Sequence, residues 1–318
     1  MTRWTRLLSL LATSLLLGVT AHAADTRTPV VLSTDIGNEI DDQWAVTYLL
    51  LQERLHVLGI LSAHAPSLPS PAAHTSFRIL TEVVQQRLGL RVHPPLIEGG
   101  SLPLEDLRRP QGSAAVNFLI KISSTFSKAN RLSVLVIGAG TDVASAILTD
   151  PSIVDRIQIV QMGFIDEKGG DEYNILNDVR AEQVILNSAV PLVIGPASVC
   201  RRDLAMTYDH ARTYLAERGP IGAWLWDEYR NWYFRNVKPL RVEDFSKPWY
   251  IWDDITLAYL LGMTEQHTGP RPHMRDDATF GSFDPSRSIT WITRVDQARL
   301  WADFAHVVDR YQRPKQIR

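Results

Sequence analysis

Short apolar runs alternate with helical patterns along most of the chain, and this alternation is the strongest constraint on its fold. The apolar runs are continuous rather than alternating in polarity, which is typical of strands buried on both faces of a parallel sheet. The strands expected from these runs span residues 30–34, 57–62, 132–137, 157–162 and 191–194, and a further strand is expected at residues 288–295, which alternate in polarity. The expected helices between them span residues 42–53, 76–87, 113–127, 141–148 and 179–187. Such a repeated order predicts an α/β fold.

The rest of the chain fits the same domain. Further helices are expected at residues 203–235, 255–262 and 297–311. Residues 268–273 contain one glycine and two prolines, so we expect a loop there. Since no internal repeat or linker divides the chain, we predict a single domain with a mostly parallel, Rossmann-like central sheet flanked by helices.

The overall charge gives no sign of a polyanionic partner. The 318 residues carry a formal net charge of −2 and are 45% hydrophobic, so the chain can bury a large core. Nucleic acid and anionic membranes are bound by strongly basic surfaces, which this balance does not favour. We therefore expect a small-molecule ligand that is recognised by a local site.

The N-terminus has the pattern of a secretory signal. Two arginines precede an apolar run at residues 7–19, and residues 21–23 (Ala-His-Ala) form a small-x-small cleavage pattern. The run is short for a membrane span, which needs about 20 residues. We predict a signal peptide over residues 1–23 and a periplasmic or secreted domain over residues 24–318, without a membrane span. The alternative is an uncleaved membrane anchor.

The chain has a single cysteine, Cys200, so no intramolecular disulfide can form. It follows an apolar run at residues 192–194. A lone cysteine in that setting is typical of a small buried apolar residue, and we do not expect a nucleophile.

A glycine turn rich in carboxylates follows the first strand. Residues 35–42 read Asp-Ile-Gly-Asn-Glu-Ile-Asp-Asp, and an amphipathic helix follows. Open α/β sheets bind their ligands at such strand-to-helix turns, at the carboxyl ends of the strands. One aspartate there is usually a helix cap, but several like charges in one turn repel unless a cation neutralises them. The turn therefore predicts a site for a hard divalent metal.

Three other segments carry polar residues or glycines to the same edge of the predicted sheet. They are residues 138–140 (Gly-Ala-Gly), 172–174 (Glu-Tyr-Asn) and 252–254 (Trp-Asp-Asp). Each lies at the end of a predicted strand or at the start of a helix. In one parallel sheet these positions face the same crevice.

Taken in order, these segments resemble the nucleoside hydrolases, the inosine-uridine preferring N-ribohydrolases. That family has an Asp-Thr-Asp-x-Gly-x-Asp-Asp turn after its first strand. Here the turn begins with Ser33 in place of the first aspartate and is two residues longer, by Asn38 and Glu39. Further matching segments are residues 59–62, 98–104, 137–144, 162–163, 172–174, 252–253 and 293–296. The resemblance covers essentially the whole mature chain and implies the nucleoside hydrolase fold.

The resemblance implies a Ca²⁺-dependent hydrolase that cleaves the N-glycosidic bond of ribonucleosides to ribose and free base. It implies that Ca²⁺ is held by the side chains of Asp35, Asp42 and Asp253 and by the carbonyl oxygen of Ile137. Asp35 would also accept a proton from the attacking water as general base. Whether the chain forms a homo-oligomer is left open.

The resemblance also implies ribose contacts. Asp41 and Asn174 would bind ribose hydroxyls, and Glu172 would bind the far side of the ribose. Cleavage of the bond creates an oxocarbenium-like cation. A pocket rich in carboxylates stabilises that charge as it develops.

The leaving-group end departs from the family pattern. Many family members have a histidine before the last metal-binding aspartate, and it assists the departing base as an acid. This chain has Trp252 there, which can stack on a base but cannot act as an acid. Candidate replacements are His64, in a Pro/Ser-rich loop that we expect to cover the pocket, and Asp166. The sequence does not decide between a purine, a pyrimidine and another aglycone.

Three alternatives to a nucleoside hydrolase stay open. The first is a catalytically weak homologue that binds a nucleoside or ribose, and the second is a hydrolase of another ribosyl compound. The third is a phosphatase with an Asp-x-Asp nucleophile, against which Ser33 argues because it occupies the nucleophile's position. Release of ribose from a panel of nucleosides would separate a hydrolase from a binding protein.

Overall fold

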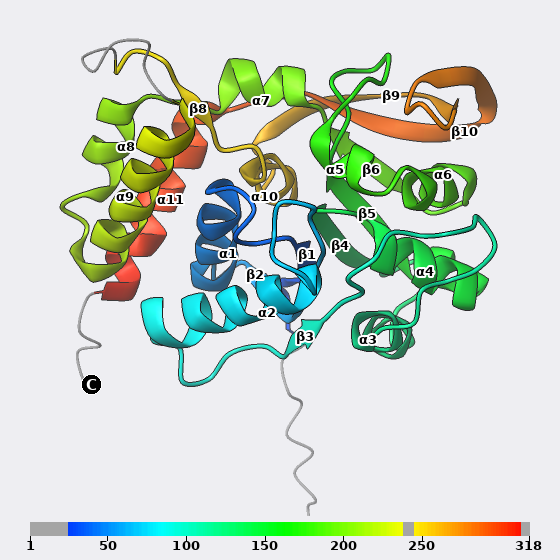
Figure 1. Cartoon of the computed structure of the whole chain (residues 1–318), viewed down its shortest axis with the longest axis horizontal. Coiled ribbons are helices and arrows are strands. Elements are labelled where there is room, and N and C mark those ends of the chain that lie inside the picture. Colours follow the sequence, from blue (N-terminus) through cyan, green and yellow to red (C-terminus); the bar gives the residue numbers. More distant parts are fainter. Residues whose placement is uncertain (1–24, 238–244, 313–318) are drawn as a thin grey trace, which may run out of the picture.

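The computed structural model describes residues 25–237 and 245–312 (Figure 1). The predicted signal peptide, residues 1–23, lies outside the described residues. Among the helices of the described ranges, none has both the length and the hydrophobicity that a transmembrane span requires.

An eight-stranded sheet forms the centre of the molecule, in the order β3-β2-β1-β4-β5-β6-β10-β9. Seven neighbouring strands run parallel, and only β9 pairs antiparallel, with β10. The strands are β1 Thr28–Thr34, β2 Leu55–Ser62, β3 Leu96–Glu98, β4 Leu132–Ile137, β5 Ile157–Met162, β6 Leu192–Gly195, β9 Thr264–Met274 and β10 Phe280–Val295. A separate two-stranded pair joins β7 Ala205–Met206 to β8 Trp249–Tyr250. The predicted mostly parallel sheet is confirmed.

Helices cover both faces of the sheet (Figure 1). They are α1 Asp41–Leu51, α2 Ala72–Glu82, α3 Ala114–Ser123, α4 Thr141–Thr149, α5 Tyr173–Asn177, α6 Val179–Asn187, α7 Ala197–Asp203, α8 Tyr208–Leu215, α9 Gly219–Trp232, α10 Asp254–Leu260 and α11 Gln297–Gln312. Short π-helical turns at Val83–Arg87 and Tyr233–Val237 extend α2 and α9, and Pro151–Asp155 forms a 3₁₀ turn. The segment at residues 203–235, expected to be helical, instead contains β7 and two separate helices.

Two apolar cores lie on opposite faces of the sheet. Val30 and Leu32 of β1 point into the core that α1, α9, α10 and α11 cover, while Val31 points into the core that α3, α4 and α6 cover. Successive strand side chains face opposite sides of a sheet. A strand buried on both faces therefore has to be apolar at every position, which explains the continuous apolar runs in the sequence.

The expectation of a loop at residues 268–273 is wrong, because these residues belong to β9. Proline cannot donate a backbone hydrogen bond, so within a sheet it is confined to edge strands and bulges. β9 is the edge strand, and its pairing with β10 shifts register between Asp284 and Ser288, opposite Pro270 and Arg271. The edge position accommodates the prolines that suggested a loop.

The strand order places a crevice at the end of β1. The chain runs outward from β1 to β2 and β3, then returns to the other side of β1 with β4. Such a reversal leaves a crevice at the carboxyl ends of the two strands that flank it. The last residues of these strands, Thr34 and Ile137, are register partners. The turn that follows Thr34 therefore opens directly into this crevice.

Candidate functional site

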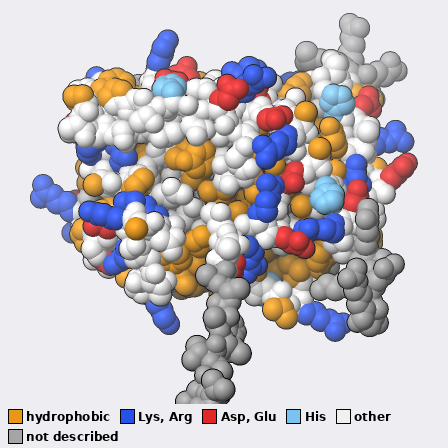
Figure 2. Space-filling view, turned by 180° about the vertical axis from the view of Figure 1, so that it is seen from behind, with side chains coloured by type: hydrophobic (Ala, Val, Ile, Leu, Met, Phe, Trp, Pro, Cys, Tyr) orange, Lys and Arg blue, Asp and Glu red, His pale blue; other side chains and the backbone are white. Residues whose placement is uncertain are grey.

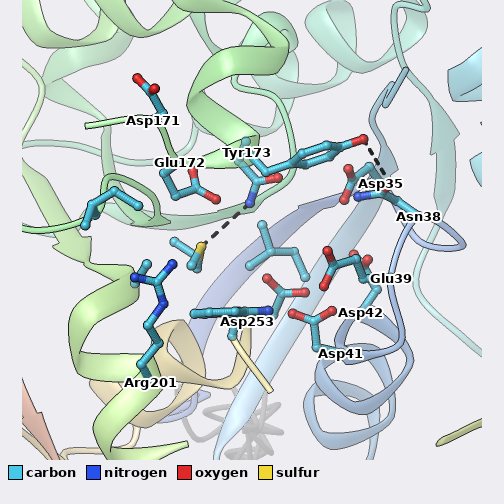
Figure 3. A pocket seen from close by; sticks show the side chains of 16 residues that line it. Asp35, Asn38, Glu39, Asp41, Asp42, Asp171, Glu172, Tyr173, Arg201 and Asp253 are labelled. Carbon is cyan, nitrogen blue, oxygen red and sulfur yellow. Dashed lines mark hydrogen bonds between the residues drawn. The ribbon is translucent and has the colours of Figure 1, made fainter. Parts of the chain in front are cut away.

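One pocket at this edge of the sheet gathers most of the residues singled out from the sequence (Figure 3). Those lining it are Asp35, Asp41, Asp42, Ile137, Glu172, Asn174, Trp252 and Asp253. The cavity measures about 640 Å³ including the space open to solvent. The pocket is thus an open, largely acidic hollow at the carboxyl edge of the sheet.

Gly37 allows the acidic turn to fold back beneath the pocket. Its φ is +102°, which favours glycine. A Cβ at this position would lie 2.3 Å from Ile79 Cδ1 of α2. The turn ends where α1 begins at Asp41, and the helix N-terminus favours the carboxylates of Asp41 and Asp42 in its first turn.

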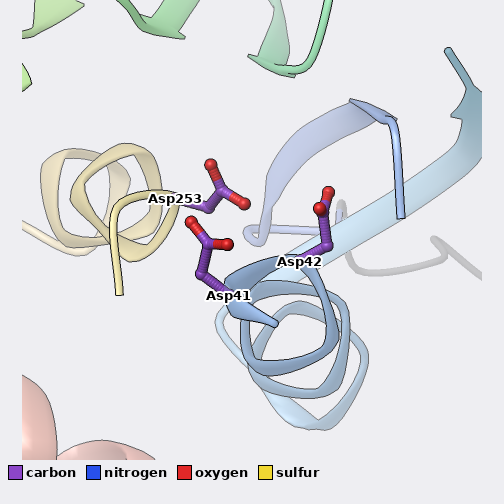
Figure 4. Close-up of side chains that lie close together, drawn as sticks. All are labelled: Asp41, Asp42 and Asp253. Atoms are coloured by element: carbon purple, nitrogen blue, oxygen red, sulfur yellow. The ribbon is translucent and has the colours of Figure 1, made fainter. Parts of the chain in front are cut away.

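Three buried carboxylates converge at the floor of the pocket (Figure 4). One oxygen from each of Asp41, Asp42 and Asp253 lies within 4.8 Å of the others, a spacing at which they could hold a metal ion. Asp253 precedes α10, so the group joins the beginning of the chain to a distant segment. The hydroxyl of Thr34 donates a hydrogen bond to Asp42 Oδ1 and orients it.

Asp35 lies next to this group. Its side chain is 1% exposed and its Oδ2 has no hydrogen-bond partner. A Cβ at Gly138 would come within 3.0 Å of the Asp35 carboxyl carbon, so glycine at 138 allows the end of β4 to approach Asp35. The resemblance groups Asp35 with Asp42 and Asp253, whereas the tightest cluster in the structure contains Asp41 instead. Asp42 and Asp253 are common to both groupings.

Burial and mutual repulsion raise the pKa of every carboxyl at the floor. The pKa of Asp41 rises to about 8 because of burial and then the charge of Asp42. The pKa values of Asp35, Asp42 and Asp253 are raised well above the usual range, first by burial and then by neighbouring carboxylates. Clustered carboxylates of this kind are stabilised in the charged form by a bound cation.

Glu172 and Asn174 form the wall opposite the floor. Glu172 caps α5, because its Oε2 accepts a hydrogen bond of 3.1 Å from the backbone N–H of Ile175. Burial raises the pKa of Glu172 to about 7. Asn174 donates a 3.8 Å hydrogen bond to Met162 Sδ at the end of β5. Both side chains are thus held in place while they line the cavity.

The structure places His64, a candidate substrate-binding residue, away from the residues that line the cavity. His64 is 4% exposed and does not line the cavity. Its Nε2 lies 2.8 Å from Thr141 Oγ1, and that hydroxyl donates to Asp178 Oδ2 at 2.6 Å. Asp166 does not line the cavity either. The loop after β2 turns inward, so His64 ties it to the start of α4.

Trp252 lines the pocket where the resemblance places it. Its ring lies 4.7 Å from that of Tyr250, centroid to centroid, and its carbonyl oxygen accepts a 3.5 Å hydrogen bond from Cys200 Sγ. Cys200 itself is fully buried, as expected for a small apolar residue. These contacts position the indole at the rim.

Sequence reasoning missed three residues at the rim. Asn38 and Glu39 were recognised only as an insertion, and Arg201 belongs to no motif. Asn38 Oδ1 accepts a hydrogen bond of 3.2 Å from the Tyr173 hydroxyl and another from Ser67 Oγ. The carboxylates in a turn next to a predicted site were the available signal for Glu39, whereas an arginine on an exposed helix gives none.

Glu39 adds a carboxylate to the rim. Burial, and then the charge of Asp41, raise its pKa to about 8, while the indoles of Trp252 and Trp249 lower it in part. Its Oε2 is buried without a hydrogen-bond partner. A buried acceptor of this kind is unusual in a folded protein, which distinguishes Glu39 from an ordinary loop carboxylate.

Solved structures similar to this chain share its fold. A purine-preferring ribonucleoside hydrolase from Gardnerella vaginalis superposes with a TM-score of 0.69 at 18% identity, covering 89% of this chain and 99% of that one. An inosine-guanosine nucleoside hydrolase superposes with a TM-score of 0.71 at 14% identity and the same coverage. At these identities the likeness shows the architecture alone.

Comparison of sequences adds a curated relative and a family. The pyrimidine-specific ribonucleoside hydrolase RihA of Enterobacter sp. (strain 638) is 23% identical over 206 residues, which are 58% of this chain and 64% of that protein, just under two thirds of its length. The model of the inosine-uridine preferring nucleoside hydrolases matches residues 30–302. Since that match extends over most of the chain and includes the whole pocket, the protein belongs to the inosine-uridine preferring nucleoside hydrolase family.

Proposed function

We propose that the protein hydrolyses the N-glycosidic bond of ribosyl compounds, ribonucleosides first among them. The observation that carries this proposal is the convergence of four buried carboxylates, Asp35, Asp41, Asp42 and Asp253, at the floor of one pocket. Membership of the nucleoside hydrolase family supports the reaction class.

The floor of the pocket has the donor set that a hard divalent cation requires. Carboxylate oxygens cluster there, one of them without any partner, and burial followed by mutual repulsion raises their pKa values, a penalty that a bound cation would offset. We propose Ca²⁺, held by Asp35, Asp42, Asp253 and the carbonyl oxygen of Ile137. When bound, the cation supplies Lewis acidity towards the attacking water and the ribose hydroxyls.

Asp35 then acts as the general base. It accepts one proton from the attacking water, whose oxygen forms a bond to the anomeric carbon. The carbon–nitrogen bond breaks, and its electron pair leaves with the nitrogen of the aglycone. Asp41 and Glu172 stabilise the positive charge that develops on the ribosyl group, and Asn174 holds a ribose hydroxyl.

A second candidate function follows from the rim. Trp252 occupies the position at which related hydrolases carry an acid, and an indole cannot protonate a leaving nitrogen. A homologue that binds a nucleoside or ribose with little turnover would retain the same floor. Activity towards several leaving groups separates the two candidates.

We also propose that the protein acts in the periplasm or outside the cell. Support comes from the N-terminal sequence alone, where an apolar run precedes a small-x-small pattern at residues 21–23. The mass of the secreted protein, measured after expression of the full chain, tests the cleavage site. Sedimentation of the same sample measures whether it forms a homo-oligomer.

A ribose-release assay tests the reaction. Inosine, uridine, cytidine and adenosine are supplied with Ca²⁺ to the wild type and to Asp35→Ala. We expect release from at least one nucleoside by the wild type and none above background by the variant. Asp155→Ala, which removes an exposed carboxylate paired with Lys128, is the matched control and should retain activity. Binding of nucleosides without any release would overturn the hydrolase proposal and leave the binding protein.

A further inference from the structure

Arg201 is the cationic exception in an acidic pocket. Among the described residues that line the cavity, seven carry carboxylates and Arg201 alone carries a positive charge. It lies on α7, with its guanidinium on the side of the pocket where Glu172 lies and across from Asp41 and Asp42 (Figure 3). The cavity therefore has an acidic floor and a basic point at its rim.

The Arg201 guanidinium contacts an indole ring but pairs with no acidic group among the described residues. Within residues 25–237 and 245–312, no carboxylate lies within the 4.0 Å of an ion pair with Arg201, although Asp171 and Glu172 line the same cavity. Its neighbour Arg202 behaves differently, pairing with Asp203 at 2.7 Å and donating to the carbonyl of Thr293 at 2.6 Å. If Arg201 served only to balance the acidic wall, such a pairing would be expected.

The position of Arg201 is nevertheless defined. Its Cζ lies 5.7 Å from the centre of the Trp252 ring, in a cation–π contact. Trp252 is itself packed against Tyr250 and held through its carbonyl by Cys200. The hydrogen-bonding edges of the guanidinium thus stay available while its position is set by the indole.

A guanidinium with its donors available matches one kind of ligand. Its planar fork of N–H groups fits the oxygens of a phosphate or a carboxylate, often in pairs. Basic side chains elsewhere are spread among acidic ones, as the opposite face of the molecule shows (Figure 2). Arg201 differs because it is an exposed cation at the rim of an acidic cavity, where it favours a ligand that places negative charge at that one point.

We propose that Arg201 binds an anionic oxygen group of the substrate, so that the preferred substrates are ribosides carrying a phosphate or a carboxylate. This inference rests on the proposed hydrolysis of ribosides. The hydroxyls of the ribose then lie at the acidic floor, and the anionic group lies at the rim beside Trp252. A phosphate would come from the ribose and a carboxylate from the aglycone.

Three substrates that share one pyrimidine core test the proposal. Uridine is neutral, uridine 5′-monophosphate adds a phosphate to the ribose, and orotidine adds a carboxylate to the base. We expect the wild type to have a higher kcat/KM for one of the two anions than for uridine. Arg201→Gln should lower the ratio of kcat/KM for the anion to kcat/KM for uridine about tenfold or more, since hydrogen bonds to charged groups are strong. Arg201→Lys should retain part of the ratio.

Arg294→Gln is the matched control, because Arg294 is an exposed arginine of β10 that lies 3.6 Å from Glu265 and outside the pocket. It should leave the ratio of anion to uridine at the wild-type value. The proposal would be overturned if, for both anions, the ratio of kcat/KM to that of uridine were the same in the wild type and in Arg201→Gln. A wild type that prefers uridine over both anions would also overturn it.

Direct binding separates this inference from the proposed function. Calorimetry compares ribose 5-phosphate with ribose and orotate with uracil, in the presence of Ca²⁺. Tighter binding of the anion by the wild type than by Arg201→Gln supports the recognition role even if no substrate is cleaved, in which case only the hydrolase proposal fails. Cleavage of uridine without any effect of Arg201 on anions refutes the recognition role and retains the hydrolase. Neither cleavage nor preferential binding refutes both.

Discussion

The floor and the rim of the pocket differ in how they are built. The floor carboxylates lie at strand ends and helix starts, and Asp35, Asp41, Asp42 and Asp253 are at most 3% exposed. The rim comes from the insertion of Asn38 and Glu39 and from the short helices α5 and α7, and its Tyr173 is 41% exposed. A floor anchored in the core is hard to vary without loss of the fold, whereas rim residues can change one by one. We therefore expect the floor to determine the reaction and the rim to determine the choice of substrate.

Removal of the metal should have the largest effect on turnover. We expect a chelator to reduce turnover to background and added Ca²⁺ to restore it, because four floor carboxylates repel one another without a cation. Calcium should also raise the melting temperature, since ligand bound only by the native state stabilises it. Turnover that survives exhaustive chelation, checked by metal analysis, would contradict the role given to the floor.

Asp35→Asn should have the next largest effect. A general base contributes about 10²–10⁴-fold to the rate, and the amide cannot accept the proton. We expect kcat to fall by that factor with little change in the melting temperature. Calcium titration of Asp35→Asn and Asp41→Asn then tests which of the two aspartates is a metal ligand. A larger loss of calcium affinity in Asp41→Asn would assign Asp41, not Asp35, to the metal.

Glu39→Gln tests the rim. Glu39 lines the cavity, so we expect kcat/KM to change about tenfold, in keeping with a hydrogen bond to a charged group. Calcium affinity should change less than in Asp42→Asn. Equal losses of calcium affinity in the two variants would move Glu39 from the rim to the floor.

The stability of the metal-free protein should fall as pH rises. The pKa values of Asp41 and Glu39 are about 8 and that of Glu172 about 7 in the folded state, against about 4 for unfolded carboxyls. The native state therefore binds more protons than the unfolded state between about pH 4 and pH 8, and its stability is lost as pH rises through that window. Denaturant unfolding at pH 5.5 and pH 8.5, with and without Ca²⁺, measures this. A flat profile without metal would contradict the electrostatic picture of the floor.

Tyr173→Phe should have the smallest effect. It removes the 3.2 Å hydrogen bond to Asn38 across the rim, and a bond between neutral groups contributes about 1 kcal/mol. We expect KM to change a few-fold and kcat to stay near the wild-type value. Steady-state kinetics decide the outcome, and a large drop in kcat would place the rim in the chemical step.

The fold could be predicted from the sequence because burial on both faces of β1, β4 and β5 requires continuous apolar runs. The loop predicted at residues 268–273 was wrong because proline content is local information, while the edge position of β9 is not. By contrast, the break between α8 and α9 has a local signal, because Gly219 has a φ of +60° and Pro220 follows it in the first turn of α9.

The site was predictable where chemistry demands a particular group, and less so elsewhere. Carboxylates after a buried strand indicate a floor, whatever the rest of the chain does. His64 was misplaced because its loop turns inward towards Thr141, and Arg201 was missed because only the fold brings α7 beside Trp252. A residue whose role depends on its neighbours in space can be identified only when the structure is known.

Asp42 and Asp253 lie far apart in the sequence, so the carboxylate cluster that they share is expected to form late in folding. Asp42 belongs to the first helix, whereas Asp253 precedes α10 near the end of the domain. Contacts between such remote segments form late, because the loop between them has to close first. A nascent chain of which only the first half has left the ribosome therefore contains Asp42 but still lacks Asp253. Calcium uptake during refolding, followed by stopped-flow fluorescence of an indicator, should coincide with the last folding phase and not with the formation of the sheet.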